Sequence, residues 1–144
     1  MKSTARATWA GSMTESAGKI TAGSGLFKDA PYSAKGRFEG GAPGTTPEEL
    51  IAAAHAACYT MALGFGLMRA KTPAKSIDTS CEVEVVMGSA GADITRSALT
   101  CKVEVPGADA AKVREIAEGA KKGCPVSKAL AGVRDLSLAL DVKV

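Results

Sequence analysis

Two cysteines lie in segments that offer very different environments for a thiol. Cys124 stands between Gly123 and Pro125 in the segment KKGCPVSK, so it can cap a short helix that begins at PVSK. Unpaired backbone N–H groups at a helix start, together with nearby lysines, favour a thiolate. Cys58 lies midway along an apolar stretch, where burial raises the pKa of a thiol. The sequence therefore nominates Cys124 as the more acidic thiol, and the two cysteines together indicate thiol-based catalysis.

Ionisation of Cys58 at neutral pH requires a cationic partner. Lowering the pKa of a thiol from about 8.5 to about 6 takes roughly 3.4 kcal/mol of differential stabilisation. One charge-assisted hydrogen bond supplies only about 1.5–3 kcal/mol. We therefore expect an arginine that a carboxylate holds rigidly, and the nearby candidates are Arg37 and Glu48.

His55 precedes Cys58 by three residues and can share its helix face. One interpretation of this spacing is a Cys58–His55 dyad, which would make the protein a thiol hydrolase or acyltransferase. The other interpretation is that His55 is a buried structural residue whose ring bonds to a backbone carbonyl. A noncatalytic dimeric binder of small apolar ligands is a further alternative. Because the chain has one histidine, a zinc site would depend almost wholly on cysteines, and we expect no metal.

A long helix is predicted to carry Cys58. Thr46 can be its N-cap, with Pro47 in the first turn and Glu49 completing a capping box. Proline disfavours helical geometry in the residue before it, so the helix ends at Lys71-Thr72-Pro73. An apolar stripe along it comprises Ile51, Ala54, Cys58, Met61, Phe65 and Met68. Alanines cover much of the remaining surface, so the helix is predicted to pack on most sides.

Alternating apolar residues predict strands over Ser80–Met87, Leu99–Val105 and Leu136–Val142. The first two are joined by a turn at Gly88–Asp93 and form a hairpin. Cys81 and Cys101 face the same side of this hairpin, and we expect them to be buried free thiols.

The remaining chain completes an α+β domain. Asp109–Lys122 is an amphipathic helix with an acidic start and a basic end, which Gly123 terminates. The N-terminal forty residues predict a glycine-interrupted meander of two or three strands. Together these segments predict a single antiparallel sheet with helices on one face.

The composition predicts one domain spanning residues 1–144. Hydrophobic residues make up 46% and aromatic residues 4%, which is enough for one modest aliphatic core. The net charge is +3 and the basic residues are scattered, so nucleic-acid binding is a poor match. The N-terminal MKSTARATWAGSM lacks the apolar stretch of a signal peptide, so we expect a cytoplasmic protein with reduced cysteines.

Leu50–Met68 is long enough to span a membrane and carries no Asp, Glu, Lys or Arg. Its alanines, glycines and histidine lower its hydrophobicity, so a buried central helix without membrane insertion is predicted. One sheet and one amphipathic helix cannot cover so apolar a helix. We therefore predict a homodimer whose long helices are buried between the subunits.

The chain resembles the osmotically inducible and organic hydroperoxide resistance proteins, the OsmC/Ohr family, over essentially its whole length. Four segments carry the resemblance: PYSAKGRFEG (31–40), GTTPEELIAAAHAACYTMAL (44–63), ITRSALT (94–100) and CPVSKAL (124–130). The histidine in HAAC resembles the OsmC branch more than the Ohr branch. The resemblance implies an OsmC-like α+β fold, with antiparallel β-sheets packed around long central helices in an intertwined homodimer.

By matching positions, the resemblance implies that Cys58 is the peroxidatic cysteine, that Cys124 is the resolving cysteine, and that Arg37 with Glu48 activates the thiolate. It implies a thiol-dependent peroxidase that reduces organic hydroperoxides, and also hydrogen peroxide. A Cys58 sulfenic acid would be captured by Cys124 as a disulfide within the subunit. No metal, flavin or other cofactor is expected.

The resemblance also implies partners and a setting. We expect an organic hydroperoxide as substrate, a thiol or dithiol reductant such as a lipoylated protein, and a second copy of the chain, in defence against oxidative and osmotic stress. Ten residues separate Glu48 from Cys58, which is about 15 Å along one helix. We therefore hypothesise that Arg37 and Glu48 of one subunit complete the site around Cys58 of the other.

Overall fold

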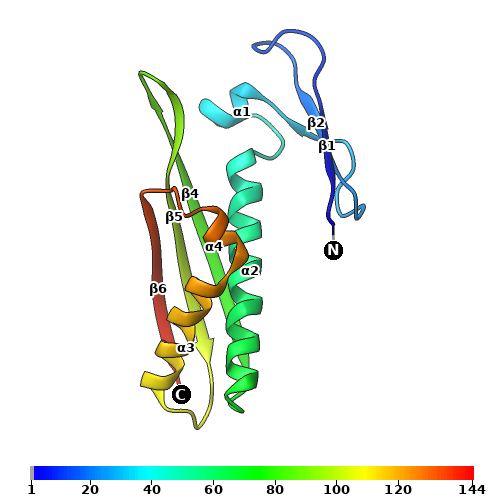
Figure 1. Cartoon of the computed structure of the whole chain (residues 1–144). Coiled ribbons are helices and arrows are strands. Elements are labelled where there is room, and N and C mark those ends of the chain that lie inside the picture. The colour runs from blue at the N-terminus through cyan, green and yellow to red at the C-terminus, as the bar shows by residue number, and fades with distance from the viewer. Residues whose placement is uncertain (1) are drawn as a thin grey trace. The chain divides into compact units, whose positions relative to one another are not determined.

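A computed structural model of the chain describes residues 2–144 (Figure 1). These residues form two compact units, Met1–Leu50 and Ile51–Val144. Strands and helices are both present, so the predicted α+β class is confirmed. The single domain expected over residues 1–144 stays a prediction.

The first unit contains the predicted N-terminal meander. Strands β1 (Ala5–Thr8), β2 (Gly18–Ala22) and β3 (Ala30–Tyr32) form an antiparallel sheet in the order β1-β2-β3. A short helix that the sequence did not predict, α1 (Ala34–Phe38), follows β3. Its local signal is Ser33, whose Oγ accepts a hydrogen bond from the Gly36 N–H at 3.0 Å. This single turn is the element that carries Arg37.

The long helix α2 (Pro47–Arg69) starts where the sequence predicts. Thr46 Oγ1 accepts the Glu49 N–H at 3.1 Å, which is the expected N-cap bond. The Glu49 carboxylate accepts a hydrogen bond from Thr45 Oγ1 at 2.7 Å. At the other end α2 stops at Arg69, and Lys71, two residues farther on, has a φ of 60°, a left-handed conformation common just after a helix.

The second unit is built on a mixed sheet in the order β4-β5-β6. Strands β4 (Ser76–Gly88) and β5 (Gly91–Glu104) form the predicted antiparallel hairpin, but both extend into the segment expected as a turn. Strand β6 (Asp135–Lys143) pairs with β5 in parallel. The expectation of a single antiparallel sheet is therefore wrong.

The parallel pairing follows from the connection between β5 and β6, because a parallel neighbour requires a crossover. The crossover contains α3 (Ala110–Gly123) and α4 (Pro125–Ala129). The Asp109 side chain caps α3 by accepting the Lys112 N–H at 2.7 Å. Gly123 is the last residue of α3, and Cys124 caps both helices. Cys124 therefore lies at the corner between α3 and α4.

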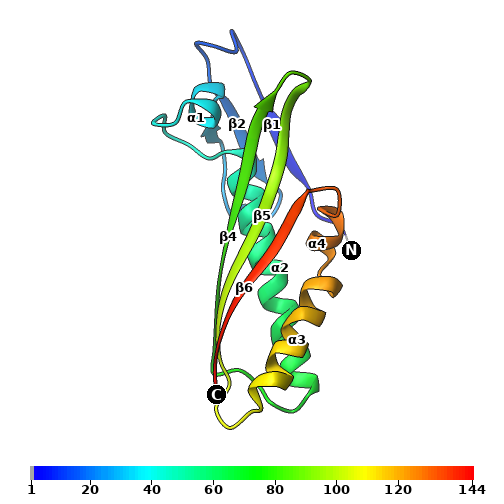
Figure 2. The same cartoon turned by 90° about the vertical axis from the view of Figure 1, so that its left-hand side faces the viewer.

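Helices α2 and α3 pack on one face of the β4-β5-β6 sheet. In Figure 2 the strands cross in front of α2, and α3 lies to the right of β6. The buried face of α2 runs through His55, Tyr59, Leu63 and Leu67, all with no exposed surface. The predicted stripe is a different face, and its members Met61, Phe65 and Met68 are each more than half exposed. In the single chain the helix is therefore not covered on most sides, because a single sheet covers only one face.

Helix α2 is long and apolar enough to cross a membrane by its length and composition alone. The helix nevertheless contributes Tyr59, Leu63 and Leu67 to the core of the second unit. These residues form one buried face of the helix, while Met61, Phe65 and Met68 on another face are exposed.

Candidate active site

Cys58 and Cys124 face each other across the junction between α2 and α4, with their Sγ atoms 2.8 Å apart. Both are free thiols; Cys58 is partly exposed and Cys124 has no exposed surface. The Ser127 N–H donates to Cys124 Sγ at 3.5 Å, in the first turn of α4. The predicted helix start at Cys124 is thus present, and it directs a backbone donor at the sulfur.

The two thiols differ in acidity in the direction that the sequence predicts. Burial on its own raises the pKa of Cys124, but hydrogen bonds from Cys58 and from the backbone and hydroxyl of Ser127 more than offset it. The pKa of Cys124 is therefore lowered. Burial raises the pKa of Cys58, and the hydrogen bond with Cys124 raises it further, while the Val126 backbone acts in the opposite direction. No arginine of Ile51–Val144 contributes to the pKa shift of Cys58 or of Cys124.

Arg37 and Glu48 form a close ion pair within the first unit. Arg37 Nη2 donates to Glu48 Oε1 at 2.6 Å, and Nε donates to Oε1 and Oε2 at 3.0 and 3.2 Å. The Glu48 side chain is 8% exposed and that of Arg37 is 33% exposed. The guanidinium carbon also lies 4.9 Å from the centre of the Phe38 ring, a cation–π distance. A carboxylate therefore holds the guanidinium in one orientation, as expected for an activating arginine.

The four predicted site residues thus form two contacting pairs. Cys58 and Cys124 are in Ile51–Val144, whereas Arg37 and Glu48 are in Met1–Leu50. Each pair combines residues from two elements. Cys58 is on α2 and Cys124 is at the corner between α3 and α4, whereas Arg37 is on α1 and Glu48 is in the first turn of α2.

His55 has partners that the sequence did not reveal. Its Nδ1 lies 2.8 Å from Ser97 Oγ on β5, and its Nε2 lies 2.8 Å from Ser127 Oγ on α4. The expected bond to a backbone carbonyl is therefore wrong, and both ring nitrogens are engaged by serine hydroxyls instead of by Cys58. An available signal was Ser97, a polar residue at an inward position of a strand, within the motif ITRSALT.

Cys81 and Cys101 lie on the core side of the hairpin, as predicted, but not directly opposite each other. Cys81 pairs with Leu99, and Cys101 pairs with Thr79. Both are free thiols, and burial raises the pKa of each. Among residues 2–144 there is no group of three or more His, Cys, Asp or Glu side chains that could hold a metal ion.

Sequence comparisons find the same family that the motifs indicate. The family described as OsmC-like protein matches residues 39–138. The chain is 45% identical over 125 residues to the peroxiredoxin OsmC of Escherichia coli, covering 87% of each protein. It is 33% identical over 108 residues to an organic hydroperoxide resistance protein of Xanthomonas axonopodis, covering 69% of each. The higher identity to the OsmC relative agrees with the branch that the HAAC motif indicates.

Solved structures share the fold. The organic hydroperoxide resistance protein OhrB of Bacillus subtilis superposes with a TM-score of 0.68 at 27% identity, covering 97% of this chain and 98% of that one. An OsmC-like protein from Mycoplasma pneumoniae superposes with a TM-score of 0.77 at 14% identity, covering 100% and 99%. The second likeness shows the fold alone.

Proposed function

This chain belongs to the OsmC family and is a cysteine-based peroxidase, and we propose that it reduces organic hydroperoxides, and also hydrogen peroxide, through Cys58 and Cys124. The observation that carries this proposal is the contact between the two Sγ atoms at 2.8 Å. A sulfenic acid formed on Cys58 has a second thiol beside it, so a disulfide can form without a large rearrangement.

The first step forms a sulfenic acid on Cys58. Its thiolate attacks the distal peroxide oxygen, the S–O bond forms as the O–O bond breaks, and the alkoxide leaves and takes up a proton to become the alcohol. Cys58 is the partly exposed thiol of the pair, which suits it to meet the substrate. Phe38, Met61 and Phe65 are exposed apolar side chains that we propose as contacts for an alkyl group.

The second step makes the disulfide. The Cys124 thiolate attacks the Cys58 sulfur, the S–S bond forms as the S–OH bond breaks, and the hydroxide leaves as water after taking up a proton. The lowered pKa of Cys124 supplies the attacking thiolate. A thiol or dithiol reductant, such as a lipoylated protein, then supplies two electrons and returns both cysteines to thiols. We place this cycle in the cytoplasm, in defence against oxidative and osmotic stress.

We propose that Arg37 activates the Cys58 thiol and that Glu48 orients Arg37. Within its own unit Cys58 has a raised pKa, so it needs a cation to ionise at neutral pH. Arg37 binds Glu48 through Nε and Nη2, which leaves Nη1 for the thiolate and the developing alkoxide. Glu48 alone would raise the pKa of the thiol, so its useful role is to hold the guanidinium.

We assign the activating pair to the partner subunit of an intertwined homodimer. The support is the separation of Glu48 from Cys58 by ten positions of α2, about 15 Å of helix rise. A second support is the exposed apolar face of α2, where Met61, Phe65 and Met68 are 59%, 57% and 57% exposed. Apolar side chains on one helix face are typical of a surface that packs against another chain.

Turnover of cumene hydroperoxide with a dithiol reductant tests the peroxidase chemistry. We expect activity in the wild type, none in Cys58→Ser, and normal activity in the control Cys101→Ala, which removes a thiol that has no part in the proposed cycle. Thiol titration after denaturation should find one disulfide per subunit only when Cys58 and Cys124 are both present. Activity that survives in Cys58→Ser would sink the proposal.

Mixed dimers test the assignment of Arg37 to the partner subunit. Subunits carrying Cys58→Ser are combined with subunits carrying Arg37→Ala, each inactive alone. If the pair acts across the interface, a mixed dimer has one site with both residues intact and regains about half of the wild-type activity per dimer. If Arg37 acts within its own subunit, neither site is intact and no activity returns.

A further inference from the structure

A buried hydrogen-bonded bridge connects the helix of Cys58 to the helix that Cys124 caps. His55 is three residues before Cys58 on α2, and Ser127 is three residues after Cys124 on α4. His55 Nε2 and Ser127 Oγ are 2.8 Å apart, while the Ser127 N–H donates to Cys124 Sγ at 3.5 Å. Ser127 is thus bound on its side-chain oxygen by His55 and on its backbone nitrogen by Cys124.

The other side of the imidazole is anchored to the sheet. His55 Nδ1 lies 2.8 Å from Ser97 Oγ on β5, and Ser97 Oγ lies 3.4 Å from Cys81 Sγ on β4. His55 and Ser97 have no exposed surface, and Ser127 is 8% exposed. A buried polar group is costly unless it is hydrogen-bonded, so each of these side chains fixes the positions of the others.

A neutral imidazole allows this network two directions, one for each tautomer. In one of these directions the Ser127 hydroxyl is left to bond to Cys124. Burial, and then the positive charge of Lys121, lower the pKa of His55. One nitrogen of a neutral imidazole donates and the other accepts. When Ser97 donates to Nδ1, Nε2–H donates to Ser127 Oγ, and the Ser127 hydroxyl hydrogen is then free for the Cys124 sulfur. The Ser127 hydroxyl and N–H both act to lower the pKa of Cys124.

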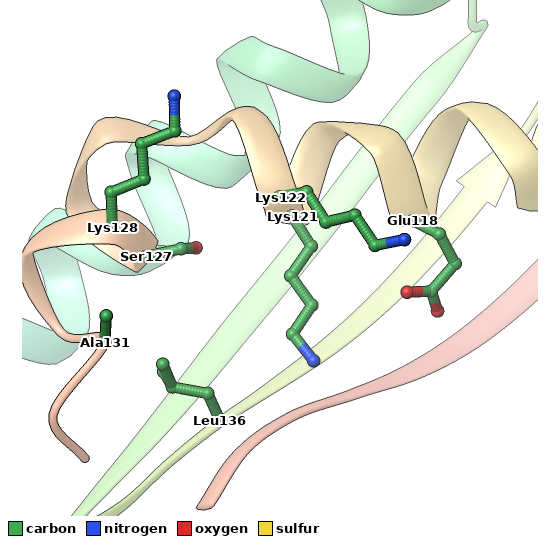
Figure 3. Close-up of a pocket in the computed structure, with 7 residues that line it drawn as sticks. All are labelled: Glu118, Lys121, Lys122, Ser127, Lys128, Ala131 and Leu136. Atoms are coloured by element: carbon green, nitrogen blue, oxygen red, sulfur yellow. The ribbon is translucent and has the colours of Figure 1, made fainter.

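Three titratable groups lie around the bridge, on α3, β4 and α2. Lys121 on α3 acts on His55, Cys81 on β4 lies 3.7 Å from His55 Nδ1, and Cys58 on α2 contacts Cys124. Ser127 also lines a cavity of about 390 Å³ (Figure 3). The charged side chains that line the same cavity are Glu118, Lys121, Lys122 and Lys128.

We propose that His55 is a positioning residue for the resolving cysteine: through Ser127 it holds the first turn of α4 so that Ser127 donates its hydrogen bonds to Cys124 Sγ. The effect of His55 on the ionisation of Cys124 does not depend on which substrate the protein takes. Its effect on the formation of the Cys58–Cys124 disulfide rests on the proposed function. Both ring nitrogens of His55 bond to serine hydroxyls, so its proposed action on Cys124 passes through Ser127.

The ionisation of Cys124 tests this bridge directly and requires no turnover. The ¹³Cβ shift of labelled Cys124 is followed against pH in a Cys58→Ser background, which removes the coupled thiol. Replacing His55 with Leu, or Ser127 with Ala, is expected to lower the fraction of Cys124 that is ionised at neutral pH by about three- to tenfold, the effect of losing one hydrogen bond. His55→Gln can still donate to Ser127 and should restore most of it.

Two controls separate positioning from general loss of stability. Leu63→Ala creates a cavity under the same helix without touching the bridge, and it should leave the titration of Cys124 unchanged. In the Ser127→Ala background, adding His55→Leu should have no further effect, because the proposed action passes through Ser127. If His55→Leu does not fold, Ser127→Ala and His55→Gln decide the question.

An unchanged Cys124 titration in a folded Ser127→Ala protein overturns the proposal, as does an equal change in Leu63→Ala. In the protein with both catalytic cysteines, Ser127→Ala should also slow disulfide formation after one equivalent of peroxide, while sulfenic acid formation keeps its rate. If the titration moves as expected but no peroxide-dependent disulfide forms in the wild type, the bridge holds and the peroxidase cycle through Cys124 fails.

Discussion

Arg37 donates two hydrogen bonds to Glu48 Oε1, from Nη2 at 2.6 Å and from Nε at 3.0 Å, and so presents one fixed orientation of its guanidinium. Lysine carries the same charge but cannot reproduce this fork. We predict that Arg37→Lys lowers the kcat/KM for cumene hydroperoxide by about ten- to a hundredfold, the range for one charge-assisted hydrogen bond. The pH–rate curve should move to higher pH, since a misplaced cation lowers the pKa of Cys58 less.

Arg96→Lys is the matched control for this prediction. Arg96 also pairs with a glutamate, Glu82 at 3.0 Å, but both side chains are exposed and such pairs contribute little. Its activity and pH profile should equal those of the wild type. An Arg37→Lys enzyme with wild-type kinetics would remove Arg37 from the site.

Cys124→Ser should stop the cycle after its first step. Without the thiol 2.8 Å away, the sulfenic acid on Cys58 persists after one equivalent of peroxide. Dimedone labelling followed by mass spectrometry should find the adduct at Cys58 in this variant and little of it in the wild type. Labelling at Cys81 or Cys101 instead would assign the peroxidatic role to another thiol.

Introducing charge on the exposed face of α2 should separate the proposed dimer. Met61 and Phe65 are one turn apart on this face, so Met61→Glu with Phe65→Glu places two carboxylates where apolar contacts are proposed. Light scattering after size exclusion should report a monomer with at least tenfold lower activity. Met13→Glu, which alters another exposed methionine, should remain dimeric and active.

The sequence predicted the parts of the site that depend on local signals. Thr46 and Pro47 marked the start of α2, and the segment GCPVSK marked a helix start at Cys124, because capping chemistry involves neighbours in the chain. The contact of Cys58 with Cys124 came only from the family resemblance, since 66 residues separate the two thiols. Spacing alone cannot bring such residues together.

The features that sequence reasoning missed depend on tertiary packing. The stripe through Met61 and Phe65 has the same period as the buried face through Tyr59 and Leu63, so hydrophobicity alone does not tell which one meets the sheet. The serine partners of His55 come from β5 and α4, elements distant in sequence. The parallel pairing of β6 with β5 is likewise a consequence of where the crossover returns.

His55 should make the stability of the folded protein depend on mildly acidic pH. The pKa of this histidine is lowered from 6.5 in the folded state by burial and by Lys121, so the unfolded chain binds its proton first as the pH falls. The contribution of neutral His55 is complete above pH 6.5 and is lost as the pH falls below 6.5 toward the folded-state pKa. Within this window the free energy of unfolding should fall by at most about 1.4 kcal/mol per pH unit for this one group.

Urea unfolding between about pH 5 and pH 7, above the range in which most carboxylates titrate, measures the slope. His55→Gln, which has no titratable ring, should be less stable at pH 7 but show a flatter dependence. Because the chain has one histidine, its ring ¹⁵N signals report the protonation state without ambiguity. An imidazole that titrates near 6.5 in the folded protein, with equal slopes for wild type and variant, would contradict the buried neutral histidine.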